Sequence, residues 1–211
     1  MILFVSFEGG EGCGKSTVIN KVKEQLSSYK VLCLREPGSN SISEQIRGIL
    51  LDPANIDITP EAEALLYAAS RAQTFNDIKK AASSYDIILC DRFLDSSLVY
   101  QGMARGLGVK SVEKINDFSL HGFRPNITFF LDVKPSIAAE RIKTRHLDRL
   151  EQENSSFHED IYQGFKRLAE ETDRIITLDA TKDADTVAAS ATKFIISYIN
   201  YYSTFLKEKN F

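Results

Sequence analysis

The sequence predicts an α/β protein built on a doubly wound, five-stranded parallel sheet, on the strength of three observations. Five short apolar runs of the kind that form buried parallel strands recur along the 211 residues. Amphipathic helical stretches lie between these runs, and no linker, repeat or low-complexity tract interrupts the alternation. We therefore expect one domain over residues 1–211, with its strands at residues 2–7, 30–34, 87–90, 127–131 and 175–178.

The expected helices are identified by apolar residues at the spacing of one helical face. In residues 17–27 these lie at positions 18, 19, 22 and 26, and in residues 41–51 at positions 42, 46, 49 and 50. A further helix is expected over residues 61–74, and residues 194–206, rich in Ile, Tyr and Phe, predict a C-terminal amphipathic helix. That last stretch is shorter than the about 18 apolar residues that a membrane-spanning helix needs, so no membrane partner is expected.

Composition and charge exclude several classes of protein. Hydrophobic residues make up 43% of the chain and charged residues 26%, which is typical of a globular domain and not of a disordered chain or a coiled coil. The 26 Lys and Arg against 29 Asp and Glu give a net charge of −3, so a dedicated nucleic-acid binder is disfavoured. Residues 1–7 lack the basic start of a signal peptide. The 3 cysteines are far apart, which predicts free thiols and a cytoplasmic location.

The strongest chemical signal is a phosphate-binding loop between the first expected strand and the first expected helix. Residues 9–16 match the pattern G-x-x-x-x-G-K-[ST] in the structural context that this motif requires. Glycines let backbone N–H groups turn towards phosphate oxygens, and the following helix adds its positive end. Lys15 is expected to hold the β- and γ-phosphates of ATP, and the Ser16 hydroxyl to bind Mg²⁺. The residues expected to form this part of the ATP site are Gly9, Gly10, Glu11, Gly12, Cys13, Gly14, Lys15, Ser16 and Thr17.

A phosphate-binding loop occurs in switches, motors and kinases, so other residues must separate these classes. A GTPase needs an Asn-Lys-x-Asp motif, but the Asn-Lys pair of this sequence, Asn20-Lys21, falls inside the first expected helix and lacks the Asp. Asp91 ends the third expected strand, as a metal-holding acid does in motor ATPases, but Arg92 follows it at once. We expect Asp91 to hold the Mg²⁺ shell through water while Arg92 faces phosphate. The alternative is an ion pair at the surface.

Arginines at strand ends favour a kinase that acts on a small phosphorylated acceptor. Arg35 follows the second expected strand and Arg92 the third, while Arg71 lies on the helix over residues 61–74. Because the carboxyl ends of parallel strands line the ligand crevice, Arg35 and Arg92 are expected to converge near the loop. Transfer between two nucleotides requires both phosphates to be neutralised. The arginine-dense interval over residues 141–156 is expected to form a short mobile lid.

These residues together resemble the bacterial thymidylate kinases over nearly the full length of the chain. The combination of motifs is far narrower than the phosphate-binding loop alone. The matching segments are FEGGEGCGKST at 7–17, REPG at 35–38, LYAASRAQ at 66–73, DR at 91–92 with Ser96, YQG at 100–102, RP at 124–125, LDRLE at 147–151 and LDAT at 178–181. The resemblance implies the P-loop nucleoside monophosphate kinase fold and a homodimer.

The resemblance also implies the reaction, which is transfer of the ATP γ-phosphate to dTMP with Mg²⁺, giving dTDP and ADP for dTTP biosynthesis. Carried over position by position, Tyr67 would cover the thymine and Arg71 would bond a thymine carbonyl. Arg35 and Arg92 would hold the acceptor phosphate. The remaining matches to the dTMP site are Ser96 beside Arg92, Tyr100 against the deoxyribose, Gln101 beside the base and Glu11 near the 3′-hydroxyl.

The donor side of the site departs from part of the family. Some members place a catalytic arginine in the phosphate-binding loop next to the acid, where this chain has Gly12. The resemblance therefore implies that the arginine comes from the lid, as either Arg145 or Arg149. Arg141 matches a residue that stacks on adenine, with Ala180 and Thr181 on the other side of the base. The Pro-Gly-Gly-Thr of the family is Pro-Gly-Ser-Asn at residues 37–40 here.

Two other classes of function remain open from the sequence. A kinase for another nucleoside monophosphate, such as dUMP, UMP or AMP, would use the same loop and lid, but Tyr67, Arg71 and Tyr100 disfavour it. A nucleotide-binding switch or interaction module would need no acceptor pocket, and the missing guanine motif and the lid arginines disfavour it.

Overall fold

A computed structural model describes residues 2–144 and 146–208, and it contains a parallel five-stranded sheet in the order β2-β3-β1-β4-β5. All of the neighbouring strands pair in parallel, which confirms the α/β prediction. Each strand lies within about one residue of its expected position. The strands are β1 (Leu3–Glu8), β2 (Val31–Arg35), β3 (Ile87–Asp91), β4 (Ile127–Asp132) and β5 (Ile175–Asp179).

Helices connect the strands, and several are longer than the sequence pattern indicates. Helix α1 begins at Lys15, directly after Gly14, whose φ of 94° lets the chain leave the loop and enter the helix within one residue. The C-terminal helix begins well before residue 194. The helices are α1 (Lys15–Gln25), α2 (Ser41–Leu51), α3 (Pro60–Ala81), α4 (Leu94–Ser97), α5 (Val109–Leu120), α6 (Pro135–Ile142), α7 (Ser155–Glu171) and α8 (Ala184–Glu208), with a π-helix η1 (Leu98–Ala104). Among the described residues, none of these helices is long and apolar enough to cross a membrane.

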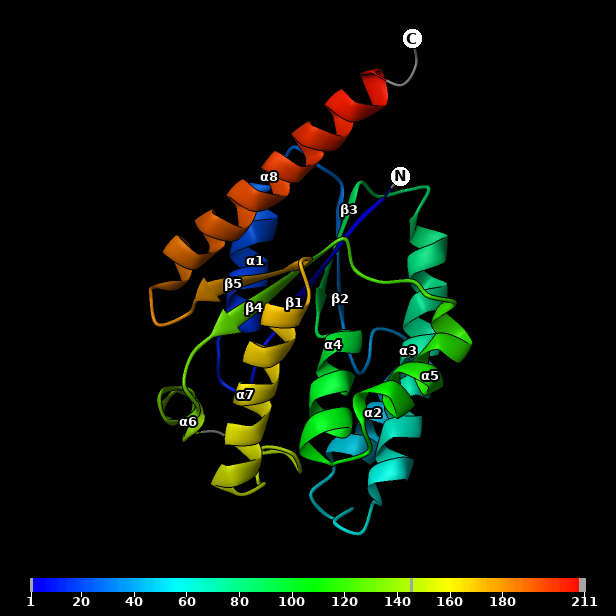
Figure 1. Cartoon of the computed structure of the whole chain (residues 1–211), viewed down its shortest axis with the longest axis vertical. Helices are drawn as coiled ribbons and strands as arrows, with labels where there is room; N and C mark the ends of the chain where they lie inside the picture. Colours follow the sequence, from blue (N-terminus) through cyan, green and yellow to red (C-terminus); the bar gives the residue numbers. More distant parts are fainter. Residues whose placement is uncertain (1, 145, 209–211) are drawn as a thin grey trace.

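The helices cover both faces of the sheet, so the central strands β1, β3 and β4 are buried on both sides. On β1, Leu3, Val5 and Phe7 pack in one apolar cluster with residues of α1 and α8, whereas Phe4 packs in a second cluster with residues of α3, α5 and α7. Figure 1 shows α8 lying along α1, with α7, α4 and α3 on the opposite side of the strands. The even-numbered residues of β1 therefore point into the helical layer that also contains α4 and η1.

The strand order places a switch point at the centre of the sheet. The chain runs from β1 to β2 and β3 on one side, and then to β4 and β5 on the other side. Ligands bind outside the carboxyl ends of the strands at such a point. The loop after β1, the end of β3 and the helix after β4 all meet there, so the fold positions a site next to Glu8.

The π-helix η1 is one of several elements that the sequence analysis does not predict. A π-helix has wider turns than an α-helix and is frequent at functional sites. Here it continues from the short helix α4, and it carries Tyr100 and Gln101 in its buried part.

Candidate active site

The loop between β1 and α1 forms a cradle that is lined by backbone groups. Gly9, Gly12 and Gly14 have φ angles of 143°, 72° and 94°, which favour glycine. Lys15 turns back over the loop, and its Nζ donates to the carbonyl oxygens of Gly9 and Gly10 at 3.2 and 3.0 Å. The ammonium group is thus held directly at the centre of the loop, where phosphates would sit.

The loop is pressed against helix α6 at Gly12. A Cβ atom added to this glycine would overlap the carbonyl oxygen of Ala138, closer than side-chain atoms approach backbone in real proteins. The positive φ of Gly12 adds strain for any other residue. An arginine side chain therefore has no room here, which explains in structural terms why this loop carries no arginine beside Glu11.

The structure brings the two residues expected at the metal into contact. The Ser16 hydroxyl donates to Oδ2 of Asp91 at 2.7 Å, across the gap between α1 and the end of β3. Hydroxyl and carboxylate oxygens are the ligands that Mg²⁺ prefers, and this ion is usually held by one or two protein oxygens together with substrate phosphates. The pair therefore fits Mg²⁺.

Arg92 lies between the two halves of the site. Its Nη1 donates to the Gly9 carbonyl oxygen at 2.9 Å and to Ser96 Oγ at 3.2 Å, and its Nη2 donates to Oε1 of Glu11 at 2.6 Å. The guanidinium also lies 5.1 Å from the ring centroid of Tyr100. The φ of Arg92 is 67°, a strained value for a non-glycine residue and one that is typical of functional sites.

Glu11 is held ionised by its neighbours. Burial alone would raise the pKa of this carboxyl, but the charges of Arg92 and Lys15 and the hydroxyl of Tyr100 lower it to about 2. The Tyr100 hydroxyl donates to Oε1 of Glu11 at 3.0 Å. Burial raises the pKa of Tyr100 and that of Tyr67, so both phenols stay protonated.

Glu8 is a functional candidate that the sequence analysis missed. It is fully buried at the end of β1, where Oε1 accepts the Phe93 backbone N–H at 2.8 Å and Oε2 accepts the Ser96 hydroxyl. Burial, aided by the nearby Asp95 carboxylate, raises the pKa of Glu8 to about 8. Glu8 thereby fixes the start of helix α4 and the side chain of Ser96. Its alternation on β1 with Phe4 and Ser6 is the signal that could have placed it in this layer.

A cavity opens next to Arg92, on the side of α3, α4 and η1. It is lined by seven of the eight residues that the resemblance places on dTMP, all except Arg35, and by several others. The lining residues are Glu11, Glu36, Pro37, Arg47, Leu51, Tyr67, Arg71, Arg92, Ser96, Ser97, Tyr100, Gln101, Asp148 and Leu150.

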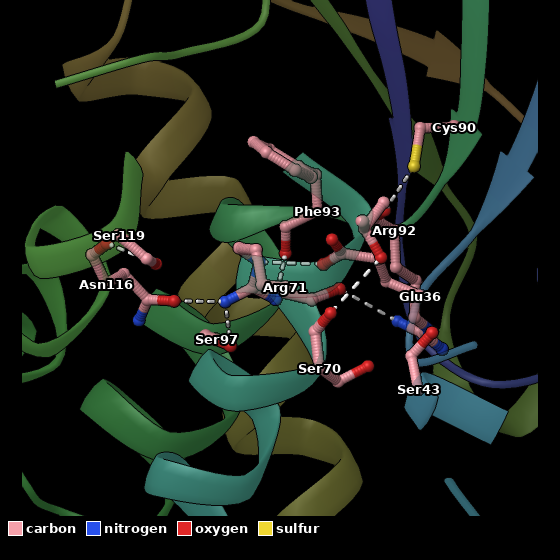
Figure 2. A network of polar contacts seen from close by, with 12 residues as sticks. Glu36, Ser43, Ser70, Arg71, Cys90, Arg92, Phe93, Ser97, Asn116 and Ser119 are labelled. Atoms are coloured by element: carbon pink, nitrogen blue, oxygen red, sulfur yellow. Dashed lines mark hydrogen bonds and ion pairs between the residues drawn. The ribbon is translucent and has the colours of Figure 1, made fainter. Parts of the chain in front are cut away.

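Arg71 is buried at the back of this cavity in a network of polar contacts. Its Nε donates to Oε2 of Glu36 at 2.7 Å and its Nη2 donates to the Phe93 carbonyl oxygen at 3.0 Å. Its Nη1 donates to Ser97 Oγ and Asn116 Oδ1 at 2.9 and 2.5 Å. Figure 2 shows the guanidinium at the centre of these partners. An arginine has five N–H donors, so a single Nη2 hydrogen is left for a ligand.

Glu36 contributes an unpaired acceptor to the same cavity. Burial raises its pKa to about 6 although Arg71 opposes the shift. Its Oε1 is buried and has no hydrogen-bond partner within residues 2–144 and 146–208. A ligand or a water molecule that donates a hydrogen bond would satisfy this oxygen.

A second, larger cleft of about 1200 Å³ lies over the loop, and it shares Arg92 and Glu11 with the first cavity. Arg35 also lines it, so the expected convergence of Arg35 and Arg92 is observed. Arg35 is half exposed and pairs with Glu44 at 2.5 Å. The lining residues are Glu11, Gly12, Gly14, Lys15, Ser16, Thr17, Arg35, Glu36, Arg47, Asp91, Arg92, Arg141, Ile142, Asp148 and Glu151.

The residues expected around adenine also lie together. Arg141 is in the last turn of α6, and its Nη2 donates to the Ala180 carbonyl oxygen at 2.9 Å. Its Nη1 donates to the Cys13 carbonyl oxygen at 3.4 Å. Thr181 follows Ala180, and its hydroxyl donates to Asp179 at 2.5 Å. The end of α6, which lines the donor cleft, is thus in contact with the loop after β5.

Arg149, one of the two lid arginines considered for the phosphates, does not line the donor cleft in this structure. It is buried in an ion pair with Glu63, at 2.7 Å from Nη2 to Oε2. Its Nε and backbone N–H donate to the carbonyl oxygens of Leu50 and Leu51 at 2.7 and 3.1 Å. A buried carboxylate and the free carbonyls at the end of α2 attract this guanidinium more strongly than an open cleft does. The other lid arginine, Arg145, lies outside the described residues.

Arg47 is a second residue that the sequence analysis missed. It lines both the cavity and the cleft, and its Nη1 donates to the Pro37 carbonyl oxygen at 2.9 Å. In the sequence, Arg47 belongs to the polar positions of an amphipathic helix, where arginine usually faces solvent. The turn at residues 36–40, which brings α2 over the sheet edge, has no sequence signal that would reveal this contact.

A phosphate-binding loop that shares Arg92 with a neighbouring acceptor cavity defines a P-loop kinase of small phosphorylated molecules. The sequence model of the family described as thymidylate kinase matches residues 7–191. Among curated proteins, the thymidylate kinase of Lactobacillus delbrueckii subsp. bulgaricus is 43% identical over 202 residues, covering 92% of this chain and 95% of that protein. The thymidylate kinase of Staphylococcus haemolyticus is 39% identical and covers 94% of this chain and 100% of its own length.

A solved structure supports the same assignment. The crystal structure of thymidylate kinase from Ehrlichia chaffeensis matches with a TM-score of 0.73 at 26% identity, covering 92% of this chain and 98% of that one. This chain therefore belongs to the thymidylate kinase family.

Proposed function

We propose that the chain transfers the γ-phosphate of ATP to dTMP, with Mg²⁺, and so forms dTDP and ADP. The observation that carries this proposal is that the donor cleft and the acceptor cavity meet at Arg92 and Glu11. A phosphoryl group needs its donor and acceptor in line, with the charge between them neutralised. Arg92 is at the junction, so one guanidinium can serve both phosphates.

The phosphate-binding loop and the residues around it bind ATP, the phosphoryl donor. Lys15 exchanges the loop carbonyls for the β- and γ-phosphates when ATP binds, and the backbone N–H groups hold the remaining oxygens. Ser16 and Asp91 would hold Mg²⁺, which neutralises and orients the phosphates when bound. Arg141 with Ala180 and Thr181 would hold the adenine at the edge of the cleft.

The cavity beside Arg92 binds dTMP, the phosphoryl acceptor. Arg35 and Arg92 hold the dTMP phosphate, while Tyr67 covers the base. Arg71 donates its last N–H to a base carbonyl. The Tyr100 ring packs against the sugar while its hydroxyl binds Glu11, and Gln101 lies beside the base. No general base is required, because positioning and charge neutralisation supply most of the rate in phosphoryl transfer.

We also propose that the enzyme works as a cytoplasmic homodimer that supplies dTTP biosynthesis. Several large apolar side chains are exposed on the helices that cover one face of the sheet, which favours a second copy as partner. These side chains are Ile42 and Ile49 of α2, Leu65 of α3 and Phe118 of α5, with exposed fractions of 51, 47, 56 and 87%. The free cysteines Cys13, Cys33 and Cys90 suit a reducing compartment.

The test of the proposed function is a comparison of acceptors. We expect steady-state ADP production from Mg-ATP to be fastest with dTMP, by about tenfold or more in kcat/KM over UMP, CMP, AMP and GMP, with dUMP closest to it. Preference for another monophosphate would support the kinase activity but contradict the assignment of dTMP as the acceptor. ATP binding without turnover on any acceptor would indicate a nucleotide-binding switch instead.

The two lid arginines are expected to respond differently to substitution. We propose that the donor phosphates are contacted by Arg145, because Arg149 is committed to Glu63 and α2. Arg145→Ala should therefore lower kcat by about a hundredfold with little change in Tm. Arg149→Ala should lower Tm, since it leaves the buried carboxylate of Glu63 short of a charge partner. Equal kcat losses with unchanged Tm in both variants would contradict this division.

A further inference from the structure

Glu63 is a buried carboxylate that no part of the reaction described above uses. It lies in the first turn of α3 with 1% of its surface exposed. Its Oε1 accepts from Gln101 Nε2 at 2.9 Å and its Oε2 accepts from Arg149 Nη2 at 2.7 Å. Arg105, at the end of η1, adds longer bonds at 3.3 and 3.4 Å. One carboxylate thus joins the acceptor cavity to the lid segment.

The contact with Glu63 determines how the Gln101 amide is oriented. A carboxylate paired with guanidinium groups can only accept hydrogen bonds, so the Gln101 atom that faces it must be the NH₂ nitrogen. The carbonyl oxygen Oε1 of Gln101 then faces the other way. No donor in the described part of the chain bonds this oxygen, and Gln101 lines the acceptor cavity. Gln101 therefore presents a hydrogen-bond acceptor to the cavity.

Arg71 supplies the complementary donor. Four of its five N–H groups are used within the protein, which leaves one Nη2 hydrogen for the cavity. A donor on Arg71 and an acceptor on Gln101, both in the wall of one cavity, match the O4 and N3–H edge of thymine or uracil. Cytosine carries the opposite pattern on the same edge, with an amino group at C4 and a bare N3, so it would leave two buried groups unpaired.

We propose, on the basis of the function proposed above, that Glu63 is the positioning residue that sets the preference for a thymine-type over a cytosine-type base. It does so by holding the Gln101 amide with its oxygen towards the base. Because Arg149 binds the same carboxylate, the lid segment is anchored on the group that orients the base contact. Glu63 itself touches no substrate, since it does not line the cavity.

The test replaces Glu63 with Gln, which has the same shape but an NH₂ group that can donate to Gln101. The Gln101 amide is then free to turn, and in the turned state it offers N–H to the base. In Glu63→Gln, we expect the ratio of kcat/KM for dTMP to that for dCMP to fall by about tenfold or more. The matched control is Arg105→Ala, which removes a Glu63 partner but keeps the Gln101 bond. Its ratio should equal that of the wild type.

A reversed pair keeps the test decisive if Glu63→Gln folds poorly. In Glu63→Gln with Gln101→Glu, the amide at position 63 donates to the carboxylate at position 101, whose second oxygen again faces the base. This pair should restore the dTMP over dCMP ratio. An unchanged ratio in Glu63→Gln, or equal losses for both nucleotides that the reversed pair does not rescue, would overturn the role of Glu63. Failure of the wild type to prefer dTMP would instead overturn the proposed function.

Discussion

Arg92→Ala is expected to lower kcat/KM for dTMP by about a hundredfold or more, which is about 2.7 kcal/mol of transition-state stabilisation. Arg92 is the guanidinium shared by the acceptor cavity and the donor cleft. Its removal leaves the acceptor phosphate without its central positive charge. It also leaves Glu11 without its ion-pair partner at the junction, where that carboxylate would repel the incoming phosphate.

Two companion variants make the Arg92 result specific. Arg92→Lys keeps the charge but loses the planar fork that binds Glu11, Ser96 and the Gly9 carbonyl oxygen together, so only part of the activity should return. Arg167→Ala removes an exposed arginine of α7 that pairs with Glu171, and its activity should match the wild type. The measurements are steady-state kinetics with dTMP and a Tm for each variant. Near-normal kinetics for Arg92→Ala would contradict the assignment of Arg92 to the active site.

Lys15→Ala is expected to cause a loss of similar size, about a hundredfold or more in kcat/KM for ATP. The ammonium group lies over the carbonyl oxygens of Gly9 and Gly10, and it helps to hold the pKa of Glu11 low. Without it, the β- and γ-phosphates would face a loop that contributes N–H groups but no full positive charge. We therefore expect both weaker ATP binding and a slower chemical step.

The control for Lys15 comes from the same helix. Lys21 of α1 forms an exposed ion pair with Asp185 of α8, so Lys21→Ala removes an equal charge without touching the loop. Its kinetics should equal those of the wild type. Binding of a fluorescent ATP analogue, measured beside the kinetics, would separate lost affinity from lost chemistry. Unchanged binding and turnover in Lys15→Ala would contradict the assignment of the loop.

Much of the fold could be predicted because its signals are local. The five strands are short apolar runs, and the loop at residues 9–16 carries glycines at the positions where the backbone takes positive φ. Arg35 and Arg92 could be placed together because the carboxyl ends of parallel strands meet at one edge. These inferences need only the pattern of the chain and the topology of its sheet.

The contacts that depend on packing between distant segments could not be predicted. Arg149 looked available for the phosphates because it follows Arg145 in a polar stretch. Its partner Glu63 is 86 residues away, on helix α3. Glu8 and Glu63 are acidic residues that would be exposed by default, and only the fold buries them among donors. The π-helix could not be predicted either, because its wider turns do not show in the spacing of apolar residues.

The contact between Gly12 and helix α6 also restricts how this enzyme can evolve. An arginine could enter the loop only after Ala138 and its helix had moved away. That movement would carry Arg141 off the Cys13 and Ala180 carbonyl oxygens before the new side chain brought any benefit. A loop with glycine at position 12 is thus separated from a loop with arginine there by an intermediate in which α6 is displaced. The two arrangements should therefore persist in separate branches of descent, and single substitutions should rarely interconvert them.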